Sequence, residues 1–323
     1  MQASYSEHCK DAMDATYALP EVQHALRASI ESAPWRDTLK GVVNDLLAAP
    51  GRVLGGHLTK WALVPLCCCA AARGDWHPAL PAAASMEMCS VATDLIDDVE
   101  DDDLSLAIER HGMPIVLNAA TALLIHAHGC LATAPEPFPG ASRRAQDALR
   151  DGLLVAASGQ HLDLASAGRD PLGVEDCLEI ARGKAGALVA AACVSGASFG
   201  TADAALLRAF HLLGLSLGVA GQLDNDMHDA NNYARKTDAA RLKQTVPIAF
   251  ARRFNASDAL EHSVWQAGIP MTYALLHAER ARAREALEAV IALCPAPVLA
   301  RSALAPVLVT SPDTTPVAAA SAS

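Results

Sequence analysis

Two acidic clusters, far apart in the chain, contain the residues with the clearest chemistry. The first includes Asp97, Asp98 and Asp101 and follows a long apolar run. On a helix, side chains three or four positions apart share a face, so these carboxylates would lie close together and repel each other. The helix dipole also opposes anions at a C-terminal end. A hard divalent cation such as Mg²⁺, which prefers oxygen ligands, would offset both effects.

The second cluster contains Asn225, Asp226 and Asp229 and also ends an apolar run. The same spacing places these side chains on one side of a helix. Mg²⁺ typically binds one or two carboxylates together with substrate phosphates and keeps several waters. Two such helix ends, facing each other across a cavity, would hold metal ions between them. For a single acidic run, a solvated helix end is the simpler interpretation, so the prediction depends on the pair.

The composition predicts an all-α protein. Of the 323 residues, 52% are hydrophobic but only 4% are aromatic, and the dominant alanine favours closely packed helices. The net charge of -11 argues against a nucleic-acid partner. We find no internal repeat and no linker of suitable composition. Residues 1–309 are therefore predicted to form one helical domain, and the Thr-, Ser-, Pro- and Ala-rich residues 310–323 a disordered tail.

Neither secretion nor stable membrane insertion is expected. The chain does not open with a positively charged segment followed by a short apolar one. Apolar runs such as residues 185–200 are broken by Gly and Ser and are too short to span a bilayer. The nine cysteines lack the paired spacing of a zinc site. They are interpreted as small core residues in a reducing cytosol, so a cytoplasmic location is expected.

Helical segments lead into both clusters. A long helix is predicted to run from about residue 82 to the first cluster, since no Gly or Pro interrupts residues 82–109. Residues 202–229 are predicted to form the helix that carries the second. Further helices are expected at residues 35–48, 115–133, 145–165, 174–198, 258–267 and 271–293.

The acidic motifs resemble, in order, the two Asp-rich motifs of the trans-isoprenyl diphosphate synthase family: Asp97-Asp98-x-x-Asp101 and Asn225-Asp226-x-x-Asp229. One such motif is weak evidence, whereas the ordered pair is specific. Other segments are similar to family elements in the expected order: residues 55–60 (GGHLTK), 110–114 (RHGMP), 159–163 (GQHLD) and 243–247 (KQTVP). Taken without the family, the polar pair Gln160 and Asp163 is more simply a polar step on a buried helix.

The resemblance implies a single-domain, all-α bundle of the isoprenoid-synthase type with a central cavity. It also implies Mg²⁺-dependent ionisation of an allylic prenyl diphosphate, with metal stabilising the departing anion. The implied metal ligands, direct or through an intermediate group, are Asp97, Asp98, Asp101, Asn225, Asp226 and Asp229. A homodimer is expected.

Cationic side chains would assist the same diphosphate. The resemblance implies phosphate contacts from Arg110, Lys184 and Lys243, and it places both lysines with the first-cluster aspartates in the catalytic set. Gln222 would orient a metal-bound water or the prenyl tail. An equally good interpretation of Gln222 is a helix-terminal amide that bonds the backbone.

The second substrate is left open by the sequence. In chain-elongating members, isopentenyl diphosphate attacks the allylic cation, and a lysine, two arginines and a histidine hold its phosphates. The matching positions here are His57, Lys60, His111 and Ser90, so none keeps the family residue. Lys60 keeps a charge but lacks the arginine fork, and the histidines are only partly charged near neutral pH.

Three activities therefore compete. Elongation to a polyprenyl diphosphate of C20 or longer is the leading prediction, since Met88 and Ala92, before the first cluster, are not aromatic. Prenyl transfer to another acceptor is the alternative, because residues 93–103 are similar to a run in ComQ-type enzymes, which prenylate a tryptophan. Terpene cyclisation is a further alternative, but Asp229 and Tyr233 stand where cyclases usually have Ser and Glu in the second motif, which argues against it. A non-catalytic regulatory subunit is disfavoured by the intact acidic motifs.

Overall fold

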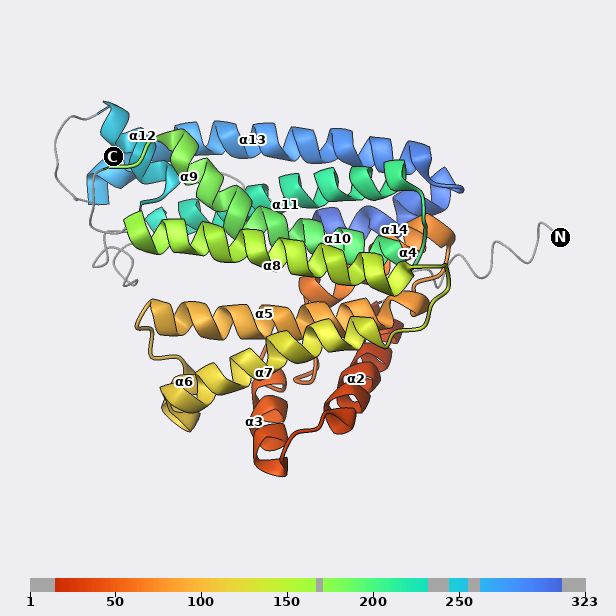
Figure 1. Ribbon diagram of the computed structural model, residues 1–323. Helices are drawn as coiled ribbons and strands as arrows, with labels where there is room; N and C mark the ends of the chain where they lie inside the picture. The colour runs from red at the N-terminus through yellow and green to blue at the C-terminus, as the bar shows by residue number, and fades with distance from the viewer. Residues whose placement is uncertain (1–14, 167–170, 232–243, 255–261, 310–323) are drawn as a thin grey trace.

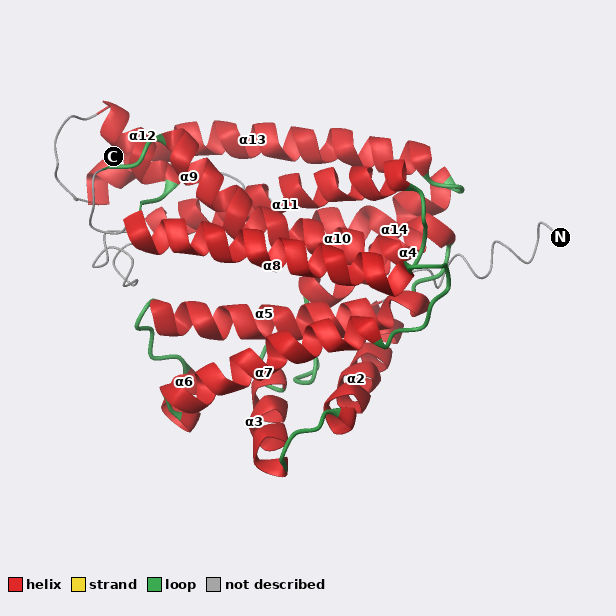
Figure 2. Ribbon diagram, viewed as in Figure 1, coloured by secondary structure: helices red, strands yellow, loops and turns green. Residues whose placement is uncertain are grey.

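The computed structural model of the protein describes residues 15–166, 171–231, 244–254 and 262–309 (Figure 1). Within these ranges the chain forms helices joined by short connections, without a strand (Figure 2). The all-α prediction is therefore confirmed. The predicted tail at residues 310–323 lies outside the described residues, so it stays a prediction, as does the domain boundary.

The helices follow one another as α2 (Ala15–Ser32), α3 (Asp37–Leu47), α4 (Lys60–Arg73), α5 (Leu80–Glu100), α6 (Leu106–His111), α7 (Met113–Ala132), α8 (Ala141–Ser166), α9 (Val174–Ala181), α10 (Ala187–Ser198), α11 (Ala204–Asn231), α12 (Val246–Phe254), α13 (His262–Leu293) and α14 (Pro297–Val309). A 3₁₀ turn, η1 (His77–Ala79), precedes α5. A π-helical turn, η2 (Arg182–Gly186), joins α9 to α10.

The predicted helix that leads into the first acidic cluster is confirmed as α5. α5 stops at Glu100, and Asp102 has a φ of 50°, the one positive value for a non-glycine among the described residues. Aspartate tolerates the left-handed region better than most residues, and the clustered carboxylates oppose the dipole at this helix end. Beyond the cluster, the stretch without Gly or Pro does not continue as one helix, because residues 106–111 form the separate α6.

Other segments also differ from the sequence-based expectation. The predicted helix over residues 174–198 contains the π-helical turn η2. Helix α13 continues through Pro270, where a break was expected; a proline inside a helix removes one hydrogen bond and can bend the helix without ending it. The short α12 and the C-terminal α14 were not predicted.

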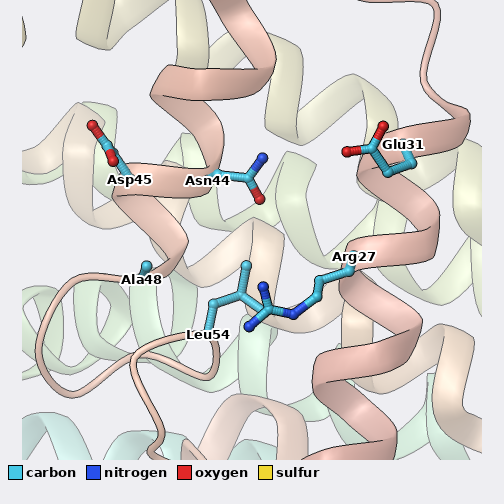
Figure 3. Close-up of a pocket in the computed structure, with 6 residues that line it drawn as sticks. All are labelled: Arg27, Glu31, Asn44, Asp45, Ala48 and Leu54. Atoms are coloured by element: carbon cyan, nitrogen blue, oxygen red, sulfur yellow. The ribbon is translucent and has the colours of Figure 1, made fainter. Parts of the chain in front are cut away.

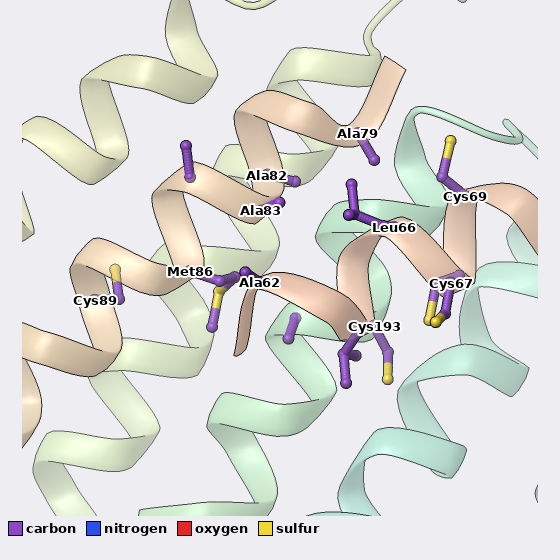
Figure 4. Close-up of a cluster of buried hydrophobic side chains, with 14 of the residues drawn as sticks. Ala62, Leu66, Cys67, Cys69, Ala79, Ala82, Ala83, Met86, Cys89 and Cys193 are labelled. Atoms are coloured by element: carbon purple, nitrogen blue, oxygen red, sulfur yellow. The ribbon is translucent and has the colours of Figure 1, made fainter. Parts of the chain in front are cut away.

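The core is built largely from small side chains. Cys67, Cys68 and Cys69 of α4 and Cys193 of α10 are fully buried. Figure 4 shows Cys67, Cys69 and Cys193 within one cluster of buried side chains. Burial raises the pKa of Cys69 to about 12, which keeps the thiol protonated and unreactive. The interpretation of these cysteines as core residues is confirmed.

The two acidic clusters lie at one end of the bundle. Figure 1 places the C-terminal ends of α5, α8 and α11 together, at the left of that view.

Two of the described helices, α7 and residues 204–230 of α11, are long and apolar enough to cross a membrane by length and composition. Core helices of soluble proteins meet the same criteria, so this is weak evidence for insertion.

Close packing of α4 on α10 depends on Gly196. A Cβ atom at this position would lie 2.1 Å from the Pro65 carbonyl oxygen, so we expect Gly196→Ala to force the two backbones apart. The expected loss is about 1–3 kcal/mol in the free energy of unfolding, measured by denaturant titration. Gly41→Ala on α3 is the control, since its Cβ meets nothing within 4 Å. Equal stability of the two variants would contradict this account.

Candidate active site

Gln160 joins the C-terminal ends of α5 and α8. Its Nε2 donates to Asp97 Oδ1 at 2.8 Å and to Glu100 Oε2 at 2.7 Å. Its carbonyl oxygen is buried and has no hydrogen-bond partner in the described part of the chain. Leaving a buried acceptor unpaired costs about 1–3 kcal/mol, so a donor such as metal-bound water would be accommodated here. Sequence reasoning gave Gln160 no role, because its partners became apparent only in the folded chain.

Lys184 bridges the same two helices from the π-helical turn η2. Its Nζ donates to Asp163 Oδ2 at 2.8 Å and lies 3.6 Å from Asp97 Oδ1. The ammonium group therefore lies between a carboxylate of α8 and one of the first acidic cluster. The fold brings this sequence-predicted lysine to the sequence-predicted Asp97.

Two glycines allow η2 to approach its neighbours this closely. A Cβ on Gly159 of α8 would lie 2.7 Å from the Lys184 amide nitrogen. A Cβ on Gly218 of α11 would lie 2.5 Å from the Ala185 carbonyl oxygen. The turn that carries Lys184 is thus held between two helix backbones. Single π-helical turns often mark functional sites.

Asp226 is the most buried carboxylate of the second cluster, with 8% of its surface exposed. Gln222 Nε2 donates to its Oδ1 at 2.8 Å, which gives Gln222 a side-chain partner rather than the backbone. Burial raises the pKa of Asp226 to about 7, and the Gln222 hydrogen bond opposes this rise. The carboxylates of Asp163 and Asp229 raise the pKa further. The Asp163 carboxylate therefore accepts a hydrogen bond from Lys184 and also makes ionisation of Asp226 on α11 less favourable.

The other predicted metal ligands differ in how exposed they are. Asp101 caps α5 and is buried, whereas Asp98 is half-buried. Burial, with repulsion from neighbouring carboxylates, raises the pKa of Asp98. On α11, Asn225 is exposed and Asp229 is half-buried.

The acidic groups fit a hard divalent cation by chemistry, because they offer only oxygen atoms and an excess of negative charge. The unpaired Gln160 carbonyl oxygen beside Asp97 also suits a metal-bound water. However, no group of three or more His, Cys, Asp or Glu side chains among the described residues is arranged to hold a metal. The six-residue ligand set therefore stays a prediction.

Arg110 and His111 have a different partner from the one expected. Arg110 lies 2.9 Å and His111 3.6 Å from Asp45 Oδ2 on α3. These contacts tie α6 to α3 and do not bring either side chain to Asp97. Phosphate contacts by these residues stay a prediction.

A pocket of about 410 Å³ lies between α2 and α3 (Figure 3). None of the predicted site residues lines it, and its charges are of both signs: Arg27, Glu31, Asn44, Asp45, Ala48 and Leu54. Glu31 pairs with Lys40 at 3.4 Å. The pocket therefore gives no support to the predicted chemistry.

The connection between α3 and α4 carries three cationic or titratable side chains. His57 and Lys60 were matched to family positions, and both are exposed. Arg52 was not among the candidate residues from the sequence, since its only signal there was its position shortly before this motif. Its guanidinium lies 2.6 Å from Asp94 Oδ2 and 3.4 Å from Ser90 Oγ, both on α5.

Glu87 holds this connection against α5. The residue is fully buried, and its carboxylate accepts from the Val53 amide at 3.1 Å and from the Thr59 hydroxyl. Burial raises the pKa of Glu87, and these two hydrogen bonds oppose the rise. Both ends of the loop are therefore tied to one side chain of α5, which fixes the position of Arg52.

Lys243 lies outside the described residues, so its predicted phosphate contact stays a prediction. The next residue, Gln244, is buried and was not noticed in the sequence. Its Oε1 accepts from the Leu172 amide at 2.6 Å and from Arg252 at 3.0 Å, and its Nε2 donates to the Ser166 carbonyl at 3.0 Å. Gln244 thus connects the segment before α12 to the end of α8.

The sequence profile of the polyprenyl synthetase family matches residues 39–266. The chain belongs to this family. It is 29% identical over 209 residues to the (2E,6E)-farnesyl diphosphate synthase of Mycobacterium tuberculosis, a match that covers 60% of this chain but only 56% of that enzyme. It is 26% identical over 177 residues to the tryptophan prenyltransferase ComQ of Bacillus spizizenii, covering 54% of this chain and 60% of ComQ.

A solved structure shares the fold. The geranylgeranyl pyrophosphate synthetase of the archaeon Geoglobus acetivorans superposes with a TM-score of 0.72 at 21% identity, covering 94% of this chain and 97% of that one. The predicted isoprenoid-synthase-type helical bundle is confirmed. At this identity, the likeness supports the fold alone.

We expect Gly159→Ala to displace η2 and with it Lys184. Affinity for inorganic diphosphate in the presence of Mg²⁺, measured by calorimetry, should fall roughly tenfold, since small displacements of a positioned charge are costly. The double variant Gly159→Ala, Lys184→Ala should bind no more weakly than Lys184→Ala alone. Gly129→Ala on α7 is the matched control, because its Cβ would meet nothing within 4 Å. Unchanged affinity in Gly159→Ala would refute the positioning role.

Proposed function

We propose that the chain is a prenyltransferase that ionises an allylic prenyl diphosphate with the help of Mg²⁺ and transfers the prenyl group. One observation carries the proposal: Lys184 lies between Asp97 of α5 and Asp163 of α8. The Asp163 carboxylate also helps to raise the pKa of Asp226 in the second cluster.

Breaking the allylic carbon–oxygen bond leaves negative charge on the departing diphosphate. Lys184 offers an ammonium donor to the phosphate oxygens, and Lys243 is assigned the same role. Bound Mg²⁺ would neutralise the leaving group as a Lewis acid. Asp97, Asp98 and Asp101 would hold it on α5, and Asn225, Asp226 and Asp229 on α11. Each such preorganised group is worth about 3–4 kcal/mol in the transition state.

The apolar stretch before the first cluster suits the prenyl chain. Met88 and Ala92 of α5 are both fully buried, and the absence of water around an allylic cation would prevent its hydrolysis. Both side chains are aliphatic, so the proposed product is a polyprenyl diphosphate of C20 or longer.

The proposed acceptor is isopentenyl diphosphate. The name of the farnesyl diphosphate synthase relative supports this choice, and so do the cationic side chains Arg52 and Lys60 next to α5. The second candidate is transfer to a different acceptor. It is favoured by the similarity to ComQ and by His57, His111 and Ser90 at the positions matched to the second substrate. A cytoplasmic homodimer is also proposed, on the family resemblance.

The deciding experiment incubates the purified full chain with Mg²⁺ and farnesyl diphosphate, with and without isopentenyl diphosphate, and identifies products by mass. Longer diphosphates would establish elongation. A hydrocarbon or alcohol formed without the second substrate would indicate cyclisation or simple ionisation. If farnesyl diphosphate remains intact under all conditions, the proposed function fails.

Asp97→Ala is expected to lower the rate of farnesyl diphosphate ionisation by about 10²–10³. The substitution removes a proposed metal ligand and the partner of both Gln160 and Lys184. The measurement is the initial rate of diphosphate release. Asp151→Ala, which removes an exposed carboxylate of α8 paired with Arg150, should leave the rate unchanged. Equal rates in both variants would exclude a catalytic role for Asp97.

Ala92→Phe is expected to shorten the product, because a bulky ring one turn before the first cluster would block the growing chain. Product length is read by mass after reaction with both diphosphates. Ala92 is fully buried, so thermal unfolding is measured beside it to show that the variant folds. A folded variant with an unchanged product would mean that the prenyl chain does not pass this position.

A further inference from the structure

The start of α12 is clamped to the end of α8 and to α9 by one buried glutamine. Gln244 is 5% exposed. Its amide oxygen accepts from the Leu172 amide and from Arg252, and its Nε2 donates to the Ser166 carbonyl. Its own backbone carbonyl accepts from the Cys177 thiol of α9 at 3.5 Å. Both ends of the side-chain amide therefore have partners, as burial of a polar group requires.

The clamp lies just before α12, whose first residue is Val246. The first amides of a helix have no carbonyl partner within that helix, and Pro247, which follows, has no N–H at all. Val246 is fully buried, so its amide needs a partner from another element. That partner is the carboxylate of Asp226 on α11, which accepts a hydrogen bond from the Val246 amide.

Helix α13 also contacts the first turn of α12. A Cβ atom on Gly268 of α13 would overlap the Pro247 carbonyl oxygen, so the two backbones touch directly. The first turn of α12 is therefore confined by the backbone of α13 and by the hydrogen bonds of Gln244. A helix start held in this way presents its amide at a fixed position.

We propose that Gln244 is a positioning residue for the second acidic cluster: it holds the start of α12 where the Val246 amide donates to the Asp226 carboxylate. This inference rests on the proposed function, in which Asp226 is a metal ligand. Gln244 acts on that site only through Val246 and Asp226.

The contact suits a carboxylate that must be charged to bind a metal ion. Asp226 is 8% exposed, and burial disfavours its ionised form. A backbone amide donor and the positive end of the α12 dipole both favour that form. Gln222 Nε2 also donates to Asp226. Two donors from different helices therefore orient the carboxylate, as partners of metal ligands commonly do.

The test compares Gln244→Met and Gln244→Glu with the wild type. Methionine keeps the unbranched shape but none of the amide hydrogen bonds, whereas glutamate keeps the acceptor and loses the donor to Ser166. The first measurement is the Mg²⁺ concentration that half-saturates binding of inorganic diphosphate, followed by calorimetry. Gln244→Met should raise this concentration about tenfold, and Gln244→Glu should lie between Gln244→Met and the wild type.

The second measurement is hydrogen exchange of the Val246 amide, which needs neither metal nor substrate. Exchange should be about tenfold faster or more in Gln244→Met than in the wild type, because the hydrogen bond to Asp226 is weakened. Asp226→Ala should have a similar effect, since it removes the acceptor. Adding Gln244→Met to Asp226→Ala should then change the exchange rate by less than about twofold.

Gln146→Met is the matched control. Gln146 lies near the start of α8, is part-buried, and donates to the His128 carbonyl of α7 at 3.4 Å. Its loss should change neither measurement. Thermal unfolding shows whether each variant folds, and if Gln244→Met does not, Gln244→Glu decides the question. Wild-type exchange at Val246 in a folded Gln244 variant overturns the proposal, as do additive effects of the Gln244 and Asp226 substitutions.

The two proposals fail separately. If the wild type ionises farnesyl diphosphate but Gln244→Met needs no more Mg²⁺ than Gln146→Met, the positioning role is overturned and the proposed function stands. If farnesyl diphosphate stays intact, the proposed function fails, while exchange at Val246 still decides whether Gln244 holds α12 against Asp226.

Discussion

The arrangement at the acidic end of the bundle depends on one ammonium group. Asp97, Asp163 and Asp226 come from three different helices, and without a counter-ion their carboxylates would repel each other as the helices packed. Lys184 lies within 3.6 Å of the first and 2.8 Å of the second. The lysine thus lets α5 and α8 converge at this end while Asp163 remains close enough to act on Asp226. The same group, held between acidic partners, is what a diphosphate would meet.

Close approach of backbones makes that position possible. Gly159 and Gly218 each face the π-helical turn at distances that exclude even a methyl group, so the turn carrying Lys184 is confined from two sides. Helix backbones also approach each other closely elsewhere in the bundle, as Gly196 of α10 does at Pro65 of α4. Helices that pack through alanine, cysteine and glycine leave little room for adjustment. Their polar ends are consequently presented at fixed positions, which suits a site that must organise charge.

Local patterns in the sequence identified most of the helices, both acidic clusters and Lys184, because each has a signal within a few residues. The helix into the first cluster was predicted to end there, and it ends at Glu100 without glycine or proline, just before a left-handed Asp102. Roles for Gln160 and Arg52 were missed, because their partners, Asp97 and Asp94, are distant in sequence, and only tertiary packing brings them together. The pairing of Arg110 with Asp45 had no sequence signal for the same reason.

The C-terminal part of α5 carries two ion pairs that have different supports. Asp94 pairs with Arg52 and Asp97 lies beside Lys184. Arg52 is held by a loop that Glu87 ties to α5, and Lys184 by a turn confined between α8 and α11. The two cations therefore reach the same helix end from independent supports. A substitution at Arg52 or Ser90 therefore need not disturb the contacts of Lys184 with Asp97 and Asp163.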